Sequence, residues 1–181
     1  MDFPSNAAPM PVVVNSLSKY FHSAATFNSF NVSTIGTGSS PGSTTSPMMP
    51  FTIPSPYLVK SLFIANGITA TGNTDIGIYQ AGATTAGCSA VVTAGSVAMS
   101  GANVLQIRTL ATPVLLPPGS YYLAVYNSTS GTFNGVTLTA VQASQCGLLE
   151  TPGALSSTVS LQRSTGLHYY LAGFSRLASG Y

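Results

Sequence analysis

Short apolar runs alternate with glycine- and proline-rich turns from Tyr57 to the end of the chain, and this pattern restricts the fold most. The runs are rich in β-branched and aromatic residues and begin about every ten to fifteen residues, as in antiparallel sandwiches. Turn pairs such as Asn66-Gly67 and Pro152-Gly153 separate them. The expected strands are Leu58 to Ala65, Thr74 to Tyr79, Ala90 to Met99, Val104 to Leu110, Ser120 to Tyr126, Val136 to Val141, Thr158 to Gln162 and His168 to Phe174. The pattern predicts an all-β fold, an antiparallel β-sandwich of the jelly-roll-like kind.

Helical signals are weak by comparison. No segment combines a helical period with capping residues at its ends, and the best candidate, Leu17 to Phe21, is a single turn. The sequence therefore predicts no helix of consequence.

The run Ser120 to Tyr126 is apolar on both faces. Because side chains alternate along a strand, one face carries Tyr122, Ala124 and Tyr126, and the other carries Tyr121, Leu123 and Val125. A strand of this kind belongs in the middle of a sheet. We expect one of its faces to contact another subunit, since an uncovered apolar sheet would aggregate.

The N-terminal part has a different composition. Residues 1–56 contain eight of the twelve prolines, and the Gly/Ser/Thr-rich segment Gly36 to Ser46 is expected to be a loop. We predict an extended N-terminal arm at residues 1–56 and a β-sandwich domain at residues 57–181. Val12 to Val14 and Ala25 to Val32 are segments able to add a strand to a sheet. Removal of residues 1–50 is accordingly expected to leave a folded sandwich.

Charged residues make up only 4% of the chain, five Lys/Arg and three Asp/Glu, against roughly a quarter in ordinary domains. So few ionisable groups argue against acid–base catalysis, and the scattered basic residues form no patch for nucleic acid. No apolar run is long enough for a transmembrane helix. The N-terminus also lacks the basic head and apolar centre of a signal peptide. We expect a protein that is not an enzyme and binds neither nucleic acid nor a membrane.

The few ionisable and nucleophilic side chains match no known catalytic or metal-binding motif. A glycosidase pair would require Asp75 and Glu150 to meet, and solvent-facing or turn-capping roles are the expectation for both. His168 is expected to be a strand or interface residue. No catalytic, cofactor-binding or metal-binding residue is predicted, because neither histidine stands at ligand spacing from a cysteine. Cys88 and Cys146 are either two free thiols or one disulfide joining strand ends.

Tyrosines leave two interpretations open. With neighbouring Asn and Ser residues they can stack on a glycan and hydrogen-bond to it, or they can serve in a core or a protein interface. The residues in question are Tyr121, Tyr126, Asn127, Tyr169 and Tyr170.

Three segments resemble a known family. Lys60 to Gly67, Gly77 to Gly82 with its Gly-Ile-Tyr start, and Leu116 to Ala124 with its Pro-Gly-Ser-Tyr-Tyr-Leu core are similar to the β-sandwich modules of tailed-bacteriophage structural proteins. The likeness spans about residues 57–127. It implies a component of the virus particle and transfers no catalytic residue.

The resemblance and the composition together predict a capsid decoration (cement) protein on the outer surface of the virion. Its expected partners are the major capsid protein or other virion proteins. A homo-oligomer is expected, and a trimer is the family expectation. The alternative is a tail or adsorption-device module that binds a host receptor or glycan. The expected interface residues are Val12, Val14, Phe27, Phe30, Met48, Phe51, Tyr121, Tyr126, Tyr169 and Tyr170.

Overall fold

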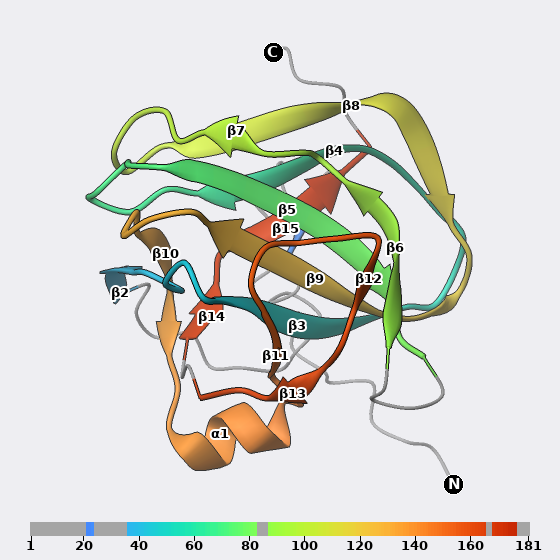
Figure 1. Ribbon diagram of the computed structural model, residues 1–181. Helices are drawn as coiled ribbons and strands as arrows, with labels where there is room; N and C mark the ends of the chain where they lie inside the picture. The colour runs from blue at the N-terminus through green and yellow to red at the C-terminus, as the bar shows by residue number, and fades with distance from the viewer. Residues whose placement is uncertain (1–20, 24–35, 83–86, 166–167, 177–181) are drawn as a thin grey trace, which may run out of the picture.

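The computed structural model describes residues 21–23, 36–82, 87–165 and 168–176, and the regular secondary structure of these residues is almost entirely β-strand (Figure 1). The strands are β1 Phe21–Ser23, β2 Gly36–Ser39, β3 Thr45–Ile53, β4 Tyr57–Ala65, β5 Asn73–Gln80, β6 Cys88–Thr93, β7 Val97–Ala98, β8 Leu105–Leu116, β9 Gly119–Asn127, β10 Phe133–Thr137, β11 Leu149–Pro152, β12 Thr158–Val159, β13 Gln162–Arg163, β14 His168–Tyr170 and β15 Ala172–Ser175. One short helix, α1 (Ala140–Gln145), is present in the described part. The predicted all-β, sandwich-like fold is confirmed. No helix among the described residues is long and apolar enough to cross a bilayer.

The strands form antiparallel sheets. The large sheet has the order β12-β6-β5-β9-β3-β11-β13, and β7 also pairs with β5. A four-stranded sheet has the order β1-β15-β4-β8, and a three-stranded sheet the order β14-β10-β2. Non-consecutive neighbours such as β5 and β9, or β4 and β15, make most of the pairing long-range in sequence.

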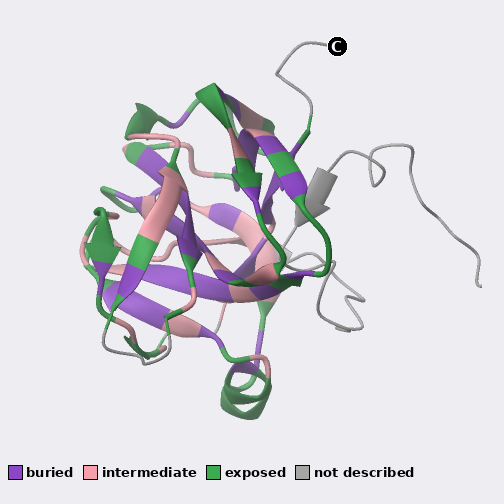
Figure 2. Cartoon of the chain, turned by 90° about the vertical axis from the view of Figure 1, so that its right-hand side faces the viewer, coloured by how far each residue is buried: buried purple, intermediate pink, exposed green. Residues whose placement is uncertain are grey.

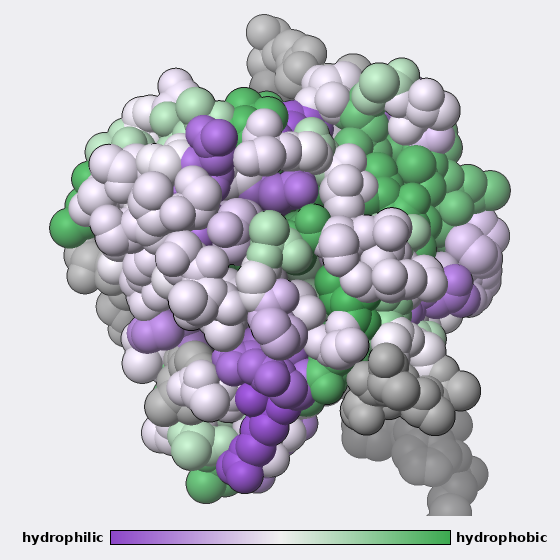
Figure 3. Space-filling model, viewed as in Figure 1, coloured by the Kyte–Doolittle hydropathy of each residue, from purple (hydrophilic) through white to green (hydrophobic). Residues whose placement is uncertain are grey.

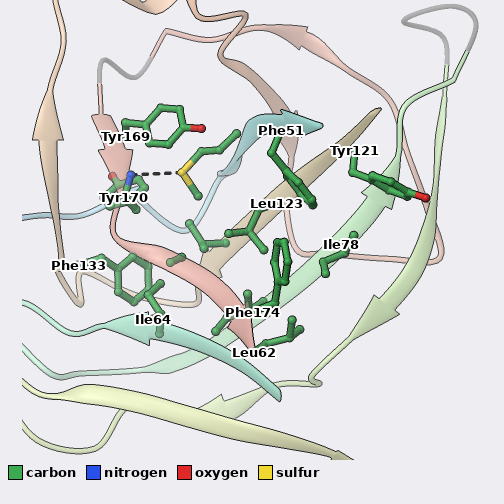
Figure 4. Close-up of a cluster of buried hydrophobic side chains, with 14 of the residues drawn as sticks. Phe51, Leu62, Ile64, Ile78, Tyr121, Leu123, Phe133, Tyr169, Tyr170 and Phe174 are labelled. Carbon is green, nitrogen blue, oxygen red and sulfur yellow. Dashed lines mark hydrogen bonds between the residues drawn. The ribbon is translucent and has the colours of Figure 1, made fainter. Parts of the chain in front are cut away.

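The main core lies between the large and the four-stranded sheets (Figure 4). Leu62 and Ile64 from β4 and Phe174 from β15 meet Ile78 from β5 and Leu123 from β9, all with no exposed surface. Alternation along each strand places these side chains on the inner faces. The core is thus assembled from strands more than a hundred residues apart in sequence.

Strands β4, β5 and β9 agree closely with the sequence-based ranges. Strand β9 lies between β5 and β3, which confirms its predicted central position. Other ranges need correction. Ala90 to Met99 is split into β6 and β7, Thr158 to Gln162 into β12 and β13, and His168 to Phe174 into β14 and β15, which belong to different sheets. The range Val104 to Leu110 extends to Leu116 as β8.

The predicted boundary between arm and sandwich is wrong. Strand β3 lies inside the supposed arm, yet it pairs with β9 along Met48 to Ile53 and with β11 along Thr45 to Met48. Met49 is fully buried in the main core. Pro47 and Pro50 lie within this central strand, whereas prolines are typical of an irregular arm. The supposed loop Gly36 to Ser46 also contains a short strand, β2.

Helix α1 replaces the end of the expected strand Val136 to Val141. Thr139 is its N-cap: its hydroxyl accepts a hydrogen bond from the Gln142 backbone N–H, while the Gln142 side chain accepts one from the Thr139 N–H. This capping box is readable from the sequence as Thr-x-x-Gln. The helix projects from the sandwich with most of its residues exposed (Figure 2), so it lacks the apolar stripe that a periodicity search detects.

The outer face of the large sheet is covered by the chain itself. Residues 153–165, called the strap below, run in front of β9 and β3 and carry β12 and β13 (Figure 1). A second apolar cluster joins Val159 of the strap to Met48, Tyr79, Cys88 and Ala124 of the large sheet. One face of β9 is predicted from its sequence to contact another subunit, and the strap of the same chain covers much of the face that carries Tyr122 and Ala124.

Candidate functional site

Glu150 on β11 is a buried carboxylate with 3% of its surface exposed. It accepts hydrogen bonds from Gln162 Nε2 (3.2 Å), Ser164 Oγ (3.3 Å), the Thr165 backbone N–H (3.0 Å) and Thr165 Oγ1 (3.2 Å). All these donors are neutral and belong to the strap. The expectation of a turn-capping role fits these bonds, whereas a solvent-facing position is excluded by the burial.

A pocket of about 40 Å³ adjoins Glu150 and is also lined by His168 and Tyr170. His168 is half-buried, its Nδ1 lies 3.3 Å from Thr137 Oγ1, and burial lowers the pKa of its imidazole. Burial raises the pKa of Tyr170 to about 12. A space of this size holds about one water molecule. The three groups therefore form a small polar corner of the sandwich.

Asp75 and Glu150 do not meet. Asp75 lies on β5 and Glu150 on β11, with β9 and β3 between them. Three strand spacings amount to about 14 Å, whereas the carboxyl groups of glycosidases stand roughly 5–9.5 Å apart. The structure therefore brings no carboxylate pair together at these residues.

Arg108 is a buried residue that the sequence analysis did not single out. From β8 its guanidinium donates to Thr74 O (2.6 Å) and Thr74 Oγ1 (2.8 Å), and to the carbonyls of Gly95 (2.9 Å) and Val97 (3.3 Å). These bonds tie the four-stranded sheet to β5 and β7 of the large sheet. Its Nε is buried with no partner. The side chain acts as a cross-link between sheets, and no sequence motif marks it.

Asp75, next to Thr74, is also buried, with 8% of its surface exposed. Burial raises the pKa of its carboxyl, although hydrogen bonds from the backbone of Ile76 and Gly95 and the charge of Arg108 oppose this. A carboxyl group whose pKa is higher in the folded than in the unfolded protein favours folding while it is protonated. This stabilisation is complete only below the pKa of the unfolded state, about 4. That contribution is lost as the pH rises through the higher folded pKa.

We therefore expect Asp75→Asn, which cannot ionise, to be more stable than the parent protein at pH 7, with the gain disappearing near pH 3. Urea unfolding followed by circular dichroism across this range measures the difference. A difference between the two proteins that stays constant with pH would contradict the expectation.

The two cysteines are free thiols in the structure. Cys88 is buried beneath the strap, and Cys146 is the half-buried C-cap of α1, where its Sγ lies 3.3 Å from the Ala143 carbonyl. They occupy different clusters on opposite faces of the large sheet. Of the two alternatives, the structure shows the free thiols and not the disulfide.

Five of the six expected interface residues that the structure describes are core residues. Met48, Phe51, Tyr121, Tyr169 and Tyr170 are at most 4% exposed. The hydroxyls of Tyr121 and Tyr169 bond to the carbonyls of Pro117 and Pro50. The interface assignment of these five is corrected, because side chains packed inside their own chain have no surface left for a partner. Val12, Val14, Phe27 and Phe30 lie outside the described residues.

Tyr126 is the sixth of these described residues, and it stays half-exposed. Asn127 is fully buried and holds the turn at Thr129, so it is not available to a glycan. The structure shows instead a hollow of about 250 Å³ at the ends of β3 and β9, lined by Phe51, Ser120, Tyr121 and Tyr122 among others. Tyr122 was not expected at such a position.

Exposed apolar side chains gather on the four-stranded sheet, where β8 forms its outer edge. Leu115 on β8 is 61% exposed, and Leu58, directly opposite on β4, is 38% exposed. Figure 3 shows an apolar area on the side of the molecule where β8 curls. Leu105 at the other end of β8 is 46% exposed. This edge offers apolar contacts for another protein.

Within the described part of the chain, no three His, Cys, Asp or Glu residues come together as metal ligands. Comparison of the chain with protein-family models, curated proteins and solved structures finds no match.

Proposed function

We propose that this protein is a non-enzymatic structural component of a virus particle, a capsid decoration (cement) protein that stabilises the shell through contacts between subunits. The observation that carries the proposal is the apolar edge of the four-stranded sheet, with Leu58 and Leu115 side by side and exposed. In a chain with 4% charged residues, contacts of this kind replace charge pairs in holding proteins together. The resemblance of residues 57–127 to phage sandwich modules points the same way.

The interface proposed here is the pair Leu58 and Leu115, and its occupant is a second copy of this chain in a homo-oligomer. Among the described strands only β4 pairs with β8, and the outer strand of a sheet beside exposed leucines suits association through both backbone and side chains. The bulge that breaks the β4–β8 register between Val59 and Ser61 limits unrestricted edge pairing. A closed oligomer, with a trimer as first expectation, fits this edge better than a fibre.

We expect Leu115→Asn to weaken self-association about tenfold, since each buried leucine side chain contributes roughly 1.5–3 kcal/mol. Light scattering over a concentration series measures the change. Val141→Asn is the matched control, because Val141 is 65% exposed on α1, outside both sheets. A parent protein that remains monomeric at micromolar concentration would refute the proposed interface.

The location in the particle tests the function itself. An antibody raised against the protein, applied to purified particles in electron microscopy, is expected to label the shell. Particles that lack the protein should disassemble at lower temperature than complete ones. Labelling on the tail would refute the cement function.

The hollow beside Tyr122 favours a second candidate, a tail or adsorption-device module that binds a host glycan or receptor. Aromatic faces next to hydroxyls are the usual means of holding a sugar, and this hollow combines Tyr122 with Ser120 and Thr52. Glycan binding that is lost in Tyr122→Ala, with stability retained, would favour this candidate.

A further inference from the structure

We propose that the strap, residues 153–165, opens as a unit while the sandwich stays folded, and that Glu150 is the latch that keeps it closed. The proposal concerns the outer face of the large sheet and does not rest on the proposed function.

The strap is weakly held compared with the sandwich. Of its thirteen residues, all of them described, only Val159 is buried, at 6% exposure. Its regular pairing with the large sheet consists of the two-residue strands β12 and β13. Segments with little buried apolar surface and few ladder bonds are the first to open in native proteins.

The strap is also separate from the main core. The side chains beneath it form their own cluster on the outer face of the large sheet, whereas the main core lies on the inner face. Opening the strap therefore leaves the contacts between the two larger sheets in place.

At the start of the strap, the Gly153 N–H donates to the Thr44 carbonyl (2.7 Å) and the Gly153 carbonyl accepts from Ser46 Oγ (2.7 Å). Beyond this anchor and the strand ladders, the contacts of the strap fall into two groups. At its first half, Tyr79 Oη donates to the Ser156 carbonyl (2.7 Å) and the Ala90 N–H to the Ser157 carbonyl (2.8 Å), both neutral bonds. In its second half, three residues of the strap donate hydrogen bonds to the Glu150 carboxylate: Gln162, Ser164 and Thr165. Hydrogen bonds to a charged acceptor are about twice as strong as neutral ones. Glu150 is thus the strongest single attachment.

Cys88 reports the state of the strap. It pairs with Val159 of the strap across β6 and β12 and is 1% exposed. A thiol reagent reaches it when the strap lifts. In a Cys146→Ser background, Cys88 is the only cysteine, so modification by Ellman's reagent follows this one site.

The first test is the dependence of Cys88 modification on urea in this background. Opening of the strap alone exposes less surface than global unfolding, so the slope of the opening free energy against urea is expected to be smaller than the global slope. Equal slopes would mean that Cys88 is reached only by global unfolding, and would overturn the proposal.

The second test is Glu150→Gln, in which an amide N–H₂ group replaces one carboxylate oxygen. This group cannot accept the hydrogen bonds that the oxygen accepted. We expect Cys88 modification to become tenfold faster or more, while the urea midpoint of global unfolding followed by circular dichroism changes little. Thr165→Ala removes one donor and keeps the carboxylate, so a smaller acceleration is expected; it also serves if Glu150→Gln fails to fold. Arg163→Gln is the control, since Arg163 lies on β13 opposite Leu149 of β11 and is not among the donors to Glu150. Modification of Glu150→Gln at the parent rate, or equal acceleration in the control, would overturn the latch.

Discussion

Deletion of residues 1–50 is expected to abolish folding. The cut removes the first six residues of β3, which lies between β9 and β11 in the large sheet. The buried side chains of Met48 and Met49 go with them, one from each apolar cluster. Losing a central strand opens both neighbouring ladders and both clusters, a cost above the roughly 5–15 kcal/mol that holds a domain folded.

Circular dichroism and size-exclusion chromatography of the truncated protein test this. Deletion of residues 1–20 is the matched control, because it keeps every described strand, and it is expected to leave the β-sheet spectrum unchanged. A soluble, cooperatively unfolding protein that lacks residues 1–50 would contradict the place of β3 in the sheet and restore the arm boundary predicted from the sequence.

Phe174→Ala is expected to cost about 3–5 kcal/mol of unfolding free energy, the usual range for a buried phenylalanine. Phe174 has no exposed surface, and its ring lies 5.1 Å from that of Phe51 and 5.3 Å, edge-on, from that of Tyr57. It therefore joins β15 to β3 and β4 in the centre of the main core (Figure 4). Truncation leaves a cavity beside the rings of Phe51 and Tyr57.

Urea unfolding of Phe174→Ala beside Val141→Ala measures this cost. The control side chain is 65% exposed on α1 and should change stability by no more than about 0.5 kcal/mol. A loss below about 1 kcal/mol for Phe174→Ala would mean that the main core is not packed around this ring.

The central strands were predictable because their side chains on the two faces are both apolar and pack against different neighbours. In β9, Leu123 and Val125 face the main core while Ala124 and Tyr122 face the strap. Such a two-sided strand is central whatever surrounds it, and the turn at Pro118-Gly119 sets where it begins. The sequence could not tell that the cover on the outer face comes from the same chain.

The errors arose where pairing partners are distant in sequence. β3 contains Pro47 and Pro50, which by local rules argue against a central strand, yet its partners β9 and β11 lie about 70 to 100 residues further on. The polar cluster at Glu150 was missed for a related reason. Its donors are ordinary Gln, Ser and Thr residues of a loop, and only the fold of the strap turns them toward the carboxylate.

The sequence by itself determined the all-β class, the existence of β4, β5 and β9, and the near-absence of charge, since these depend on side-chain period, turn residues and composition, which are local. The tertiary structure alone decided which tyrosines are buried, that β3 belongs to the large sheet, and that Arg108 joins two sheets. Burial and hydrogen bonding at those residues depend on strands that come together from distant parts of the chain. A local sequence pattern does not predict which distant strands pair.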